Sequence, residues 1–175
     1  MALDPSKGYR ALRHGRHSRD GVEYFVTFCT DQRQTVLASE AAAPVILAEI
    51  QKMETEGIWV MRCAVIMPDH VHMLFQLGSS LTLGRAIARL KSKSLLGLKV
   101  GGGSHWQAGY FEHRLRPDEN PLPLFLYIHL NPYKAGLLPA SSVWPWYRCR
   151  KEDMDWFSSY LNQGLPEPTW LNGLP

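Results

Sequence analysis

Runs of apolar residues in the first half of the chain predict three β-strands. Residues 22–30 (VEYFVTFCT) are rich in β-branched and aromatic residues, which favour a strand. Residues 58–67 (IWVMRCAVIM) form a continuous apolar run, which is typical of a strand buried on both faces. The Met-Pro-Asp sequence at 67–69 predicts a turn, since proline cannot donate to a strand ladder. Residues 70–77 (HVHMLFQL) are then the returning strand of a hairpin.

Two further segments have the apolar spacing of amphipathic helices. The first follows Ser39, a candidate N-cap, and extends to about residue 55. Its apolar residues expected to face the core are Val45, Ile46, Ala48 and Ile50. The second follows Thr82 and extends from residue 83 to about residue 99. Its apolar residues form one stripe, made of Leu83, Ile87, Leu90 and Leu95.

A weak strand is expected within residues 105–116, followed by a third helix that begins at Asn120. Asn120 is suited to cap this helix, and Pro121 suits its first position, where the missing N–H costs nothing. The helix should end near Asn131, because Pro132 discourages its continuation.

The predicted order of elements is compatible with an α+β fold. Strand, helix, strand, strand, helix, strand and helix match a ferredoxin-like, split βαβ sandwich, in which an antiparallel sheet carries helices on one face. We expect a basic N-terminal arm over residues 1–21, one domain over residues 22–143, and an aromatic, proline-rich C-terminal tail over residues 144–175.

The composition favours a soluble protein of the cytoplasm. Hydrophobic residues make up 45% of the chain and charged residues 20%, which is ordinary for a globular domain. The three cysteines form no CxxC pair, which argues against a zinc ribbon or a secreted disulfide scaffold. No apolar core follows the basic N-terminus, and no apolar run approaches the ~20 residues of a membrane span.

The basic residues gather in stretches that suggest a polyanion partner, although the net charge is only +3. Residues 1–19 contain the single acid Asp4, and the second helix contains none. Either stretch alone could equally be an ordinary solvated face. The candidate DNA-binding residues are Arg10, Arg13, Arg16, Arg19, Arg85, Arg89, Lys93, Arg114 and Arg116. Three aromatic residues beside the last two, Trp106, Tyr110 and Phe111, are suited either to stack unpaired bases or to pack in the core.

A histidine pair at the start of the third strand is the first candidate for chemistry. Side chains two apart on a strand point to the same face, so His70 and His72 can bind one metal ion. The alternative is an ordinary half-buried strand that contains two histidines, because an HxH sequence alone is a weak motif.

Tyr127 and Asn131 lie four positions apart on the third predicted helix, and so on one helix face. A phenol is a poor nucleophile unless it is activated or its target is polarised by a cation. The amide oxygen of Asn131 can join the histidines as a ligand, and such mixed ligation suits Mg²⁺ or Mn²⁺ better than a closed zinc site. In the alternative interpretation, Tyr127 packs in the core and Asn131 caps the helix before Pro132.

Three segments together resemble the REP-associated tyrosine transposases, which are single-tyrosine HUH endonucleases related to the small single-strand transposases of bacterial insertion sequences. These segments are MPDHVHMLF, WQAGYFEHRLR and YIHLNPYKAGL, and the resemblance covers about residues 8–150. The insertion-sequence relatives carry Gln where Asn131 stands, whereas the REP-associated branch carries Asn.

The resemblance implies a function and a role for each candidate residue. Tyr127 would be the nucleophile that forms a 5′-phosphotyrosine link with single-stranded DNA, and His70, His72 and Asn131 would bind Mg²⁺ or Mn²⁺. The basic arm would recognise hairpin DNA such as a REP element. One alternative is a hairpin-binding protein without catalysis, and another is a phosphodiesterase that uses water, although the chain has no HxT/S motifs. The base that activates Tyr127 and the choice between monomer and homodimer stay open.

Overall fold

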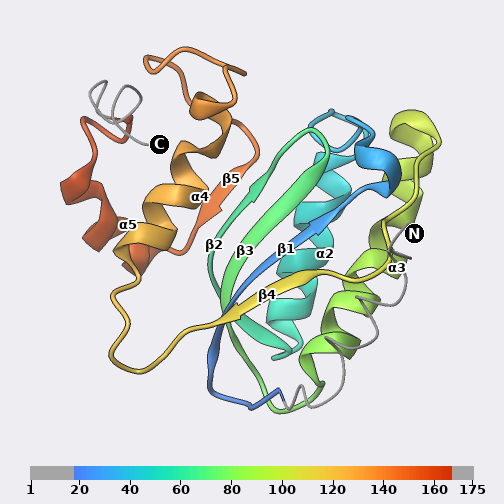
Figure 1. The fold of residues 1–175 in the computed structure, drawn as a ribbon, viewed down its shortest axis with the longest axis horizontal. Coiled ribbons are helices and arrows are strands. Elements are labelled where there is room, and N and C mark those ends of the chain that lie inside the picture. Colours follow the sequence, from blue (N-terminus) through green and yellow to red (C-terminus); the bar gives the residue numbers. More distant parts are fainter. Residues whose placement is uncertain (1–17, 167–175) are drawn as a thin grey trace, which may run out of the picture.

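A five-stranded antiparallel sheet organises the computed structural model, which describes residues 18–166 (Figure 1). The spatial order of its strands is β4-β1-β3-β2-β5, and every neighbouring pair is antiparallel. The strands are β1 (Glu23–Cys29), β2 (Trp59–Ile66), β3 (His70–Leu77), β4 (Phe111–Arg114) and β5 (Tyr147–Cys149). The hairpin of β2 and β3 turns where it was predicted, and Met67 N donates to His70 O across the turn at 2.8 Å.

Helices cover both faces of this sheet. They are α2 (Ala43–Thr55), α3 (Leu83–Gly102), α4 (Leu122–Lys134) and α5 (Lys151–Phe157), with short 3-10 turns η1 (Asp31–Arg33) and η2 (Ser158–Tyr160). In Figure 1, α2 and α3 lie on one side of the sheet and α4 and α5 on the other. The predicted α+β class is confirmed. The prediction that helices lie on one face of the sheet holds for α2 and α3, whereas α4 packs on the opposite face. No helix in the described range is long and apolar enough to cross a membrane.

The two faces of the sheet produce two hydrophobic cores, because side chains alternate along each strand. On β1, Tyr24 and Val26 belong to the core beneath α2 and α3. The intervening Phe25 belongs to the second core, where it is joined by Phe125 of α4 and Phe157 of α5. A side chain on β1 or β3 therefore reaches α4 only if it shares the face of Phe25.

Helix α3 begins where its sequence predicts, whereas α2 begins later than predicted and buries a different set of residues. Thr82 Oγ1 accepts a hydrogen bond from Arg85 N at 3.4 Å and so caps α3. Helix α2 begins four residues after Ser39, and its buried side chains are those of Ala43, Ile46, Ile50 and Met53. The prediction was wrong for Val45 and Ala48, which are exposed. The buried residues recur at intervals of three and four, so they form one face of the helix, and Val45 and Ala48 lie off that face.

Helix α4 continues past the point where Pro132 was expected to end it. Pro132 lies inside the helix, which extends to Lys134. Proline lacks an N–H, so one helical bond is lost, but it does not prevent the next residues from bonding. Ala135 N donates to Asn131 O at 3.0 Å, and Leu137 N donates to Pro132 O at 3.0 Å. Asn131 is therefore an interior residue of the helix, which contradicts the alternative that it is the terminal cap.

Residues 144–157, expected to belong to a C-terminal tail, join the sheet and the second core. Strand β5 pairs with β2, and Trp144 Nε1 donates to Ile66 O at 3.0 Å. Phe157 of α5 is fully buried. The strand has only three residues, too few for a pattern of alternation that could be recognised in the sequence.

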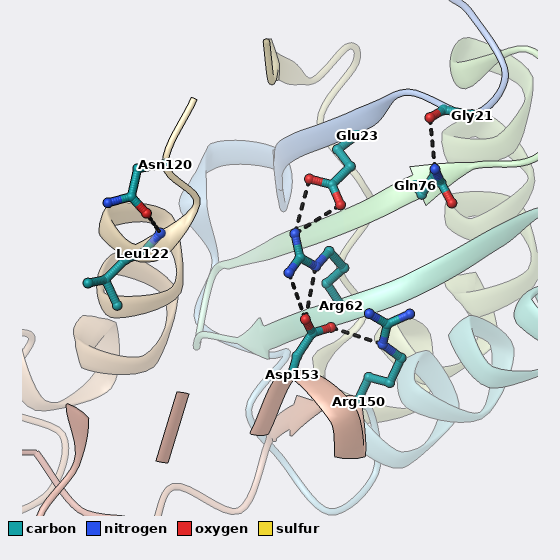
Figure 2. A network of polar contacts seen from close by, with 8 residues as sticks. All are labelled: Gly21, Glu23, Arg62, Gln76, Asn120, Leu122, Arg150 and Asp153. Carbon is teal, nitrogen blue, oxygen red and sulfur yellow. Dashed lines mark hydrogen bonds and ion pairs between the residues drawn. The ribbon is translucent and has the colours of Figure 1, made fainter. Parts of the chain in front are cut away.

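A network of charged side chains fixes α5 to the sheet (Figure 2). Arg62, at the bulge of β2, donates to both carboxylate oxygens of Glu23 on β1, at 2.9 and 3.1 Å. It also donates twice to Asp153 Oδ1 of α5, at 3.1 and 2.7 Å, while Arg150 Nε donates to Asp153 Oδ2 at 3.0 Å. The Arg62 guanidinium lies 5.0 Å from the centroid of the Phe125 ring. One side chain thus connects β1, β2, α4 and α5.

Candidate active site

The two histidines of β3 face α4 from the centre of the sheet. His72 lies between Thr27 of β1 and Val65 of β2 and is only 3% exposed. His70 begins the strand at the hairpin turn and is partly exposed. The alternation predicted from the sequence holds, because the intervening Val71 packs in the core on the other side.

One nitrogen of each histidine ring is occupied by a neighbouring side chain. His70 Nδ1 lies 2.6 Å from Asp69 Oδ1, and an ionised carboxylate can only accept, so His70 carries its proton on Nδ1. His72 Nδ1 lies 2.7 Å from Thr27 Oγ1. The two remaining Nε2 atoms are 3.0 Å apart. When His72 is protonated on Nδ1, Thr27 Oγ1 accepts from it, and both Nε2 atoms then carry a lone pair.

Burial keeps both histidines neutral. Burial lowers the pKa of His70, although the neighbouring Asp69 acts in the opposite direction. Burial also lowers the pKa of His72 to about 3, and the charges of His70 and Arg33 add to this effect. Neutral imidazole is the form that binds metal ions, so the pair is prepared as ligands at neutral pH.

The arrangement fits a divalent metal ion. Two adjacent ligands of an octahedral ion, each about 2.1 Å from it, lie about 3.0 Å apart, which is the separation of the two Nε2 atoms. The side chain of Asn131 acts on the pKa of His70, so it lies beside that ring and is the candidate for a third ligand. Within residues 18–166, no three His, Cys, Asp or Glu side chains are grouped so as to hold a metal ion, so the set depends on the amide of Asn131.

Tyr127 lies one helical turn before Asn131 and beside the same histidines. Its ring centroid is 5.1 Å from that of His72 and 5.8 Å from that of Phe25, in edge-on contacts. It nevertheless stays 47% exposed, so the alternative of a packed core tyrosine does not describe it. The structure thus brings Tyr127, Asn131, His70 and His72 together from two elements.

Three residues beside the histidines were missed in the sequence: Thr27, Asp69 and Arg33. Arg33 Nε forms an ion pair with Asp69 Oδ2 at 2.7 Å, on the side away from His70. Asp69 could have been suspected, because it directly precedes His70. Thr27 and Arg33 are 45 and 37 positions from the histidine that each supports, and only the pairing of β1 with β3 brings them close.

The basic residues are distributed over several surfaces, and they do not all lie near the histidines. Arg85 and Lys93 are exposed on α3, which covers the other face of the sheet, and Arg89 is paired with Glu56 at 2.5 Å. The remaining described members are Arg19, Arg114 and Arg116, of which the last two are exposed around β4. Arg10, Arg13 and Arg16 lie outside the described residues.

Comparisons with known proteins agree with this architecture. A family profile described as IS200-like transposase matches residues 18–117. The structure of a REP-associated tyrosine transposase bound to a REP hairpin has a TM-score of 0.61 at 20% identity, covering 77% of this chain and 81% of that chain. A protein of Deinococcus radiodurans R1, described as a candidate transposase, has a TM-score of 0.47 at 21% identity, covering 66% of this chain and 95% of that chain. None of the curated proteins compared with the chain matches it.

Proposed function

Since the chain belongs to the family of IS200-like transposases, we propose that it nicks and rejoins single-stranded DNA, with Tyr127 as the covalent nucleophile. The observation that carries this proposal is the convergence of an exposed tyrosine with two neutral histidines whose free nitrogens are 3.0 Å apart. A tyrosine with only a packing role is expected to be buried, whereas Tyr127 is exposed and lies beside the two histidines.

His70, His72 and Asn131 would hold a Mg²⁺ or Mn²⁺ ion. When bound, the ion neutralises negative charge on the oxygens of the scissile phosphate. Asp69 and Thr27 keep the two imidazoles in the orientation and tautomer that leave Nε2 available, as carboxylate and hydroxyl partners do for metal-binding histidines in general.

The proposed reaction exchanges one phosphoester for another. The Tyr127 oxygen loses its proton to solvent and forms a bond to phosphorus, while the bond from phosphorus to the 3′ oxygen breaks and that oxygen takes up a proton. The product is a 5′-phosphotyrosine link and a free 3′-hydroxyl. Because the energy of the ester is retained in this link, attack by a 3′-hydroxyl reverses the step and joins strands without ATP.

Hairpin DNA is the proposed substrate. The similar transposase was solved with a REP hairpin, and the basic N-terminal residues of this chain suit the phosphates of such a ligand. A hairpin-binding protein without catalysis is the second candidate, favoured by the exposed Arg85 and Lys93 of α3, which lie on the face of the sheet opposite α4.

Incubation with a labelled single strand that contains a hairpin, in the presence of Mn²⁺, tests the proposal. We expect a protein–DNA adduct that survives denaturation and disappears in Tyr127→Phe. Tyr160→Phe is a matched control, because Tyr160 is also exposed (41%) but lies on η2, where it contacts Trp156. Binding without an adduct would support the second candidate, and cleavage that persists in Tyr127→Phe would indicate water as the nucleophile.

Two further variants separate recognition from chemistry. His70→Ala should abolish the adduct and leave hairpin affinity nearly intact, and a loss of binding would place His70 in recognition or folding. Deletion of residues 1–19 should weaken hairpin binding while the circular dichroism spectrum is retained. An unchanged affinity would remove the arm from the proposed binding surface.

A further inference from the structure

An exposed aromatic ring stands on the face of the sheet that carries the candidate site. Phe111 of β4 is 59% exposed, which is more than any other Phe, Tyr or Trp among residues 18–166. It pairs with Thr27, the residue bonded to His72, and its ring lies 6.2 Å from that of Phe25 in an edge-on contact. Residues 18–166 thus leave this large apolar ring uncovered beside the candidate site, where it is available for contact with a ligand.

The two aromatic residues that precede Phe111 in this segment pack against the protein core. Trp106 and Tyr110 pack, partly buried, against the core beneath α2 and α3. Trp106 also donates from Nε1 to Ser94 Oγ at 3.2 Å and contacts the ring of Phe28 at 5.0 Å. The sequence left the whole aromatic group with two interpretations, and the structure divides it: core packing for these two, and an open ring only for Phe111.

Phe25 connects this open ring to the nucleophile. Its centroid is 6.2 Å from that of Phe111 and 5.8 Å from that of Tyr127, so the two exposed rings lie within about 12 Å of each other. Stacked nucleotides follow one another at about 3.4 Å along a strand. A base resting on Phe111 therefore belongs to a nucleotide within about four positions of the phosphate that Tyr127 attacks.

We infer that Phe111 is a stacking site for one unpaired nucleobase next to the cleavage position. The inference rests on the proposed function and adds a nucleobase-binding subsite to it. Aromatic side chains stack on the π-face that every base has, so the contact supplies affinity and positions the strand without selecting a sequence. The exposed aliphatic residues of α3, Leu96 and Val100, cannot form such a contact.

The test is a binding scan with abasic sites. Affinity for a hairpin with a single-stranded flank is measured in the Tyr127→Phe background, so that no cleavage intervenes, and each flank nucleotide in turn is replaced by an abasic residue. Stacking energies predict that Phe111→Ala weakens binding of the intact strand by about 5- to 150-fold. At one abasic position, within about four nucleotides of the cleavage site, Phe111→Ala should have no further effect, while Phe111→Trp should bind the intact strand like the parent.

Leu96→Ala, which removes an apolar side chain of α3 that is 69% exposed, is the matched control and should leave affinity unchanged. Thermal unfolding of Phe111→Ala must stay close to that of the parent. Parent-like binding by Phe111→Ala, or an equal loss at every abasic position, would overturn the inference. Because the scan measures binding alone, a wild-type protein that forms no adduct would reject the proposed chemistry without deciding the stacking site.

Discussion

Removal of the Arg62 side chain should loosen α5 from the sheet and lower the stability of the whole domain. The exposed fraction of the side chain is 16% for Arg62 and 5% for its partner Asp153. Loss of one partner of a buried ion pair typically costs about 3–5 kcal/mol, because the other charge stays buried without compensation. Arg150 still bonds Asp153 in the variant, which places the expected cost of Arg62→Met near the lower end, about 3 kcal/mol. Glu23 is 31% exposed, so water compensates for most of its lost contact.

Urea unfolding followed by tryptophan fluorescence measures this change. If the free energy of unfolding falls by about 2 kcal/mol per molar urea, the urea midpoint of Arg62→Met should lie about 1.5 M below that of wild type. Arg62→Met combined with Asp153→Asn should cost less than the sum of the two single variants, since each removes the other's partner. Lys151→Met is the control: it removes the exposed pair with Asp155 and should leave the midpoint unchanged. A midpoint within 0.3 M of wild type for Arg62→Met, a threshold of about 0.6 kcal/mol, would show that the network does not hold α5.

Three other changes have outcomes that follow from single contacts. Thr27→Val removes the partner of His72 Nδ1, so calorimetry should find Mn²⁺ affinity about 10- to 100-fold weaker, whereas Thr27→Ser should bind like wild type; equal affinities would contradict the orienting role. Burial lowers the pKa of His129 to about 4, and neither of its ring nitrogens has a hydrogen-bond partner within residues 18–166, so the folded state resists protonation. The contribution of neutral His129 to the free energy of unfolding is complete above pH 6.5 and decreases as the pH falls towards 4. Between pH 7 and pH 5 the free energy of unfolding should fall by on the order of 1–2 kcal/mol. His129→Phe should therefore flatten the dependence of the urea midpoint on pH, and an unchanged slope would assign it to other groups. Gly78→Ala would place a Cβ 2.2 Å from the carbonyl oxygen of Gly57 and should lower the melting temperature, at a cost of about 1–3 kcal/mol, whereas Gly84→Ala meets only an ordinary contact at 3.7 Å and should not.

The sequence predicted those parts of the fold that depend on local pattern. Strands β1, β2 and β3 follow from runs of apolar and β-branched residues, helix α3 follows from its apolar stripe, and the turn before His70 follows from its proline. The sequence did not predict the C-terminal limit of α4. Pro132 removes only one hydrogen bond of the last turn, and the carbonyl groups of Asn131 and Pro132 still accept hydrogen bonds from the residues that follow. Strand β5 is too short for a pattern and exists only because β2 offers it an edge.

The candidate site divides in the same way. The histidine pair, the tyrosine and the asparagine are visible as spacings of two and four residues within single elements. The supporting contacts of Thr27 and Arg33 join positions far apart in the chain, so strand register had to be known first. Whether Phe111 faces solvent depended on which side of β4 it occupies, and four strand residues do not reveal that phase. Trp106 and Tyr110 precede β4, where no regular pattern predicts their orientation.

The ring of Phe25 contacts three residues of the proposed DNA site, and this bears on any redesign of the protein. Its ring stacks on His72 at 5.5 Å and meets the edges of both Tyr127 and Phe111. Under the proposed function, ion affinity, the position of Tyr127 and base stacking on Phe111 would therefore change together when Phe25 is replaced. Attempts to change how tightly the protein holds single-stranded DNA should therefore leave Phe25 untouched and vary Phe111, which is exposed.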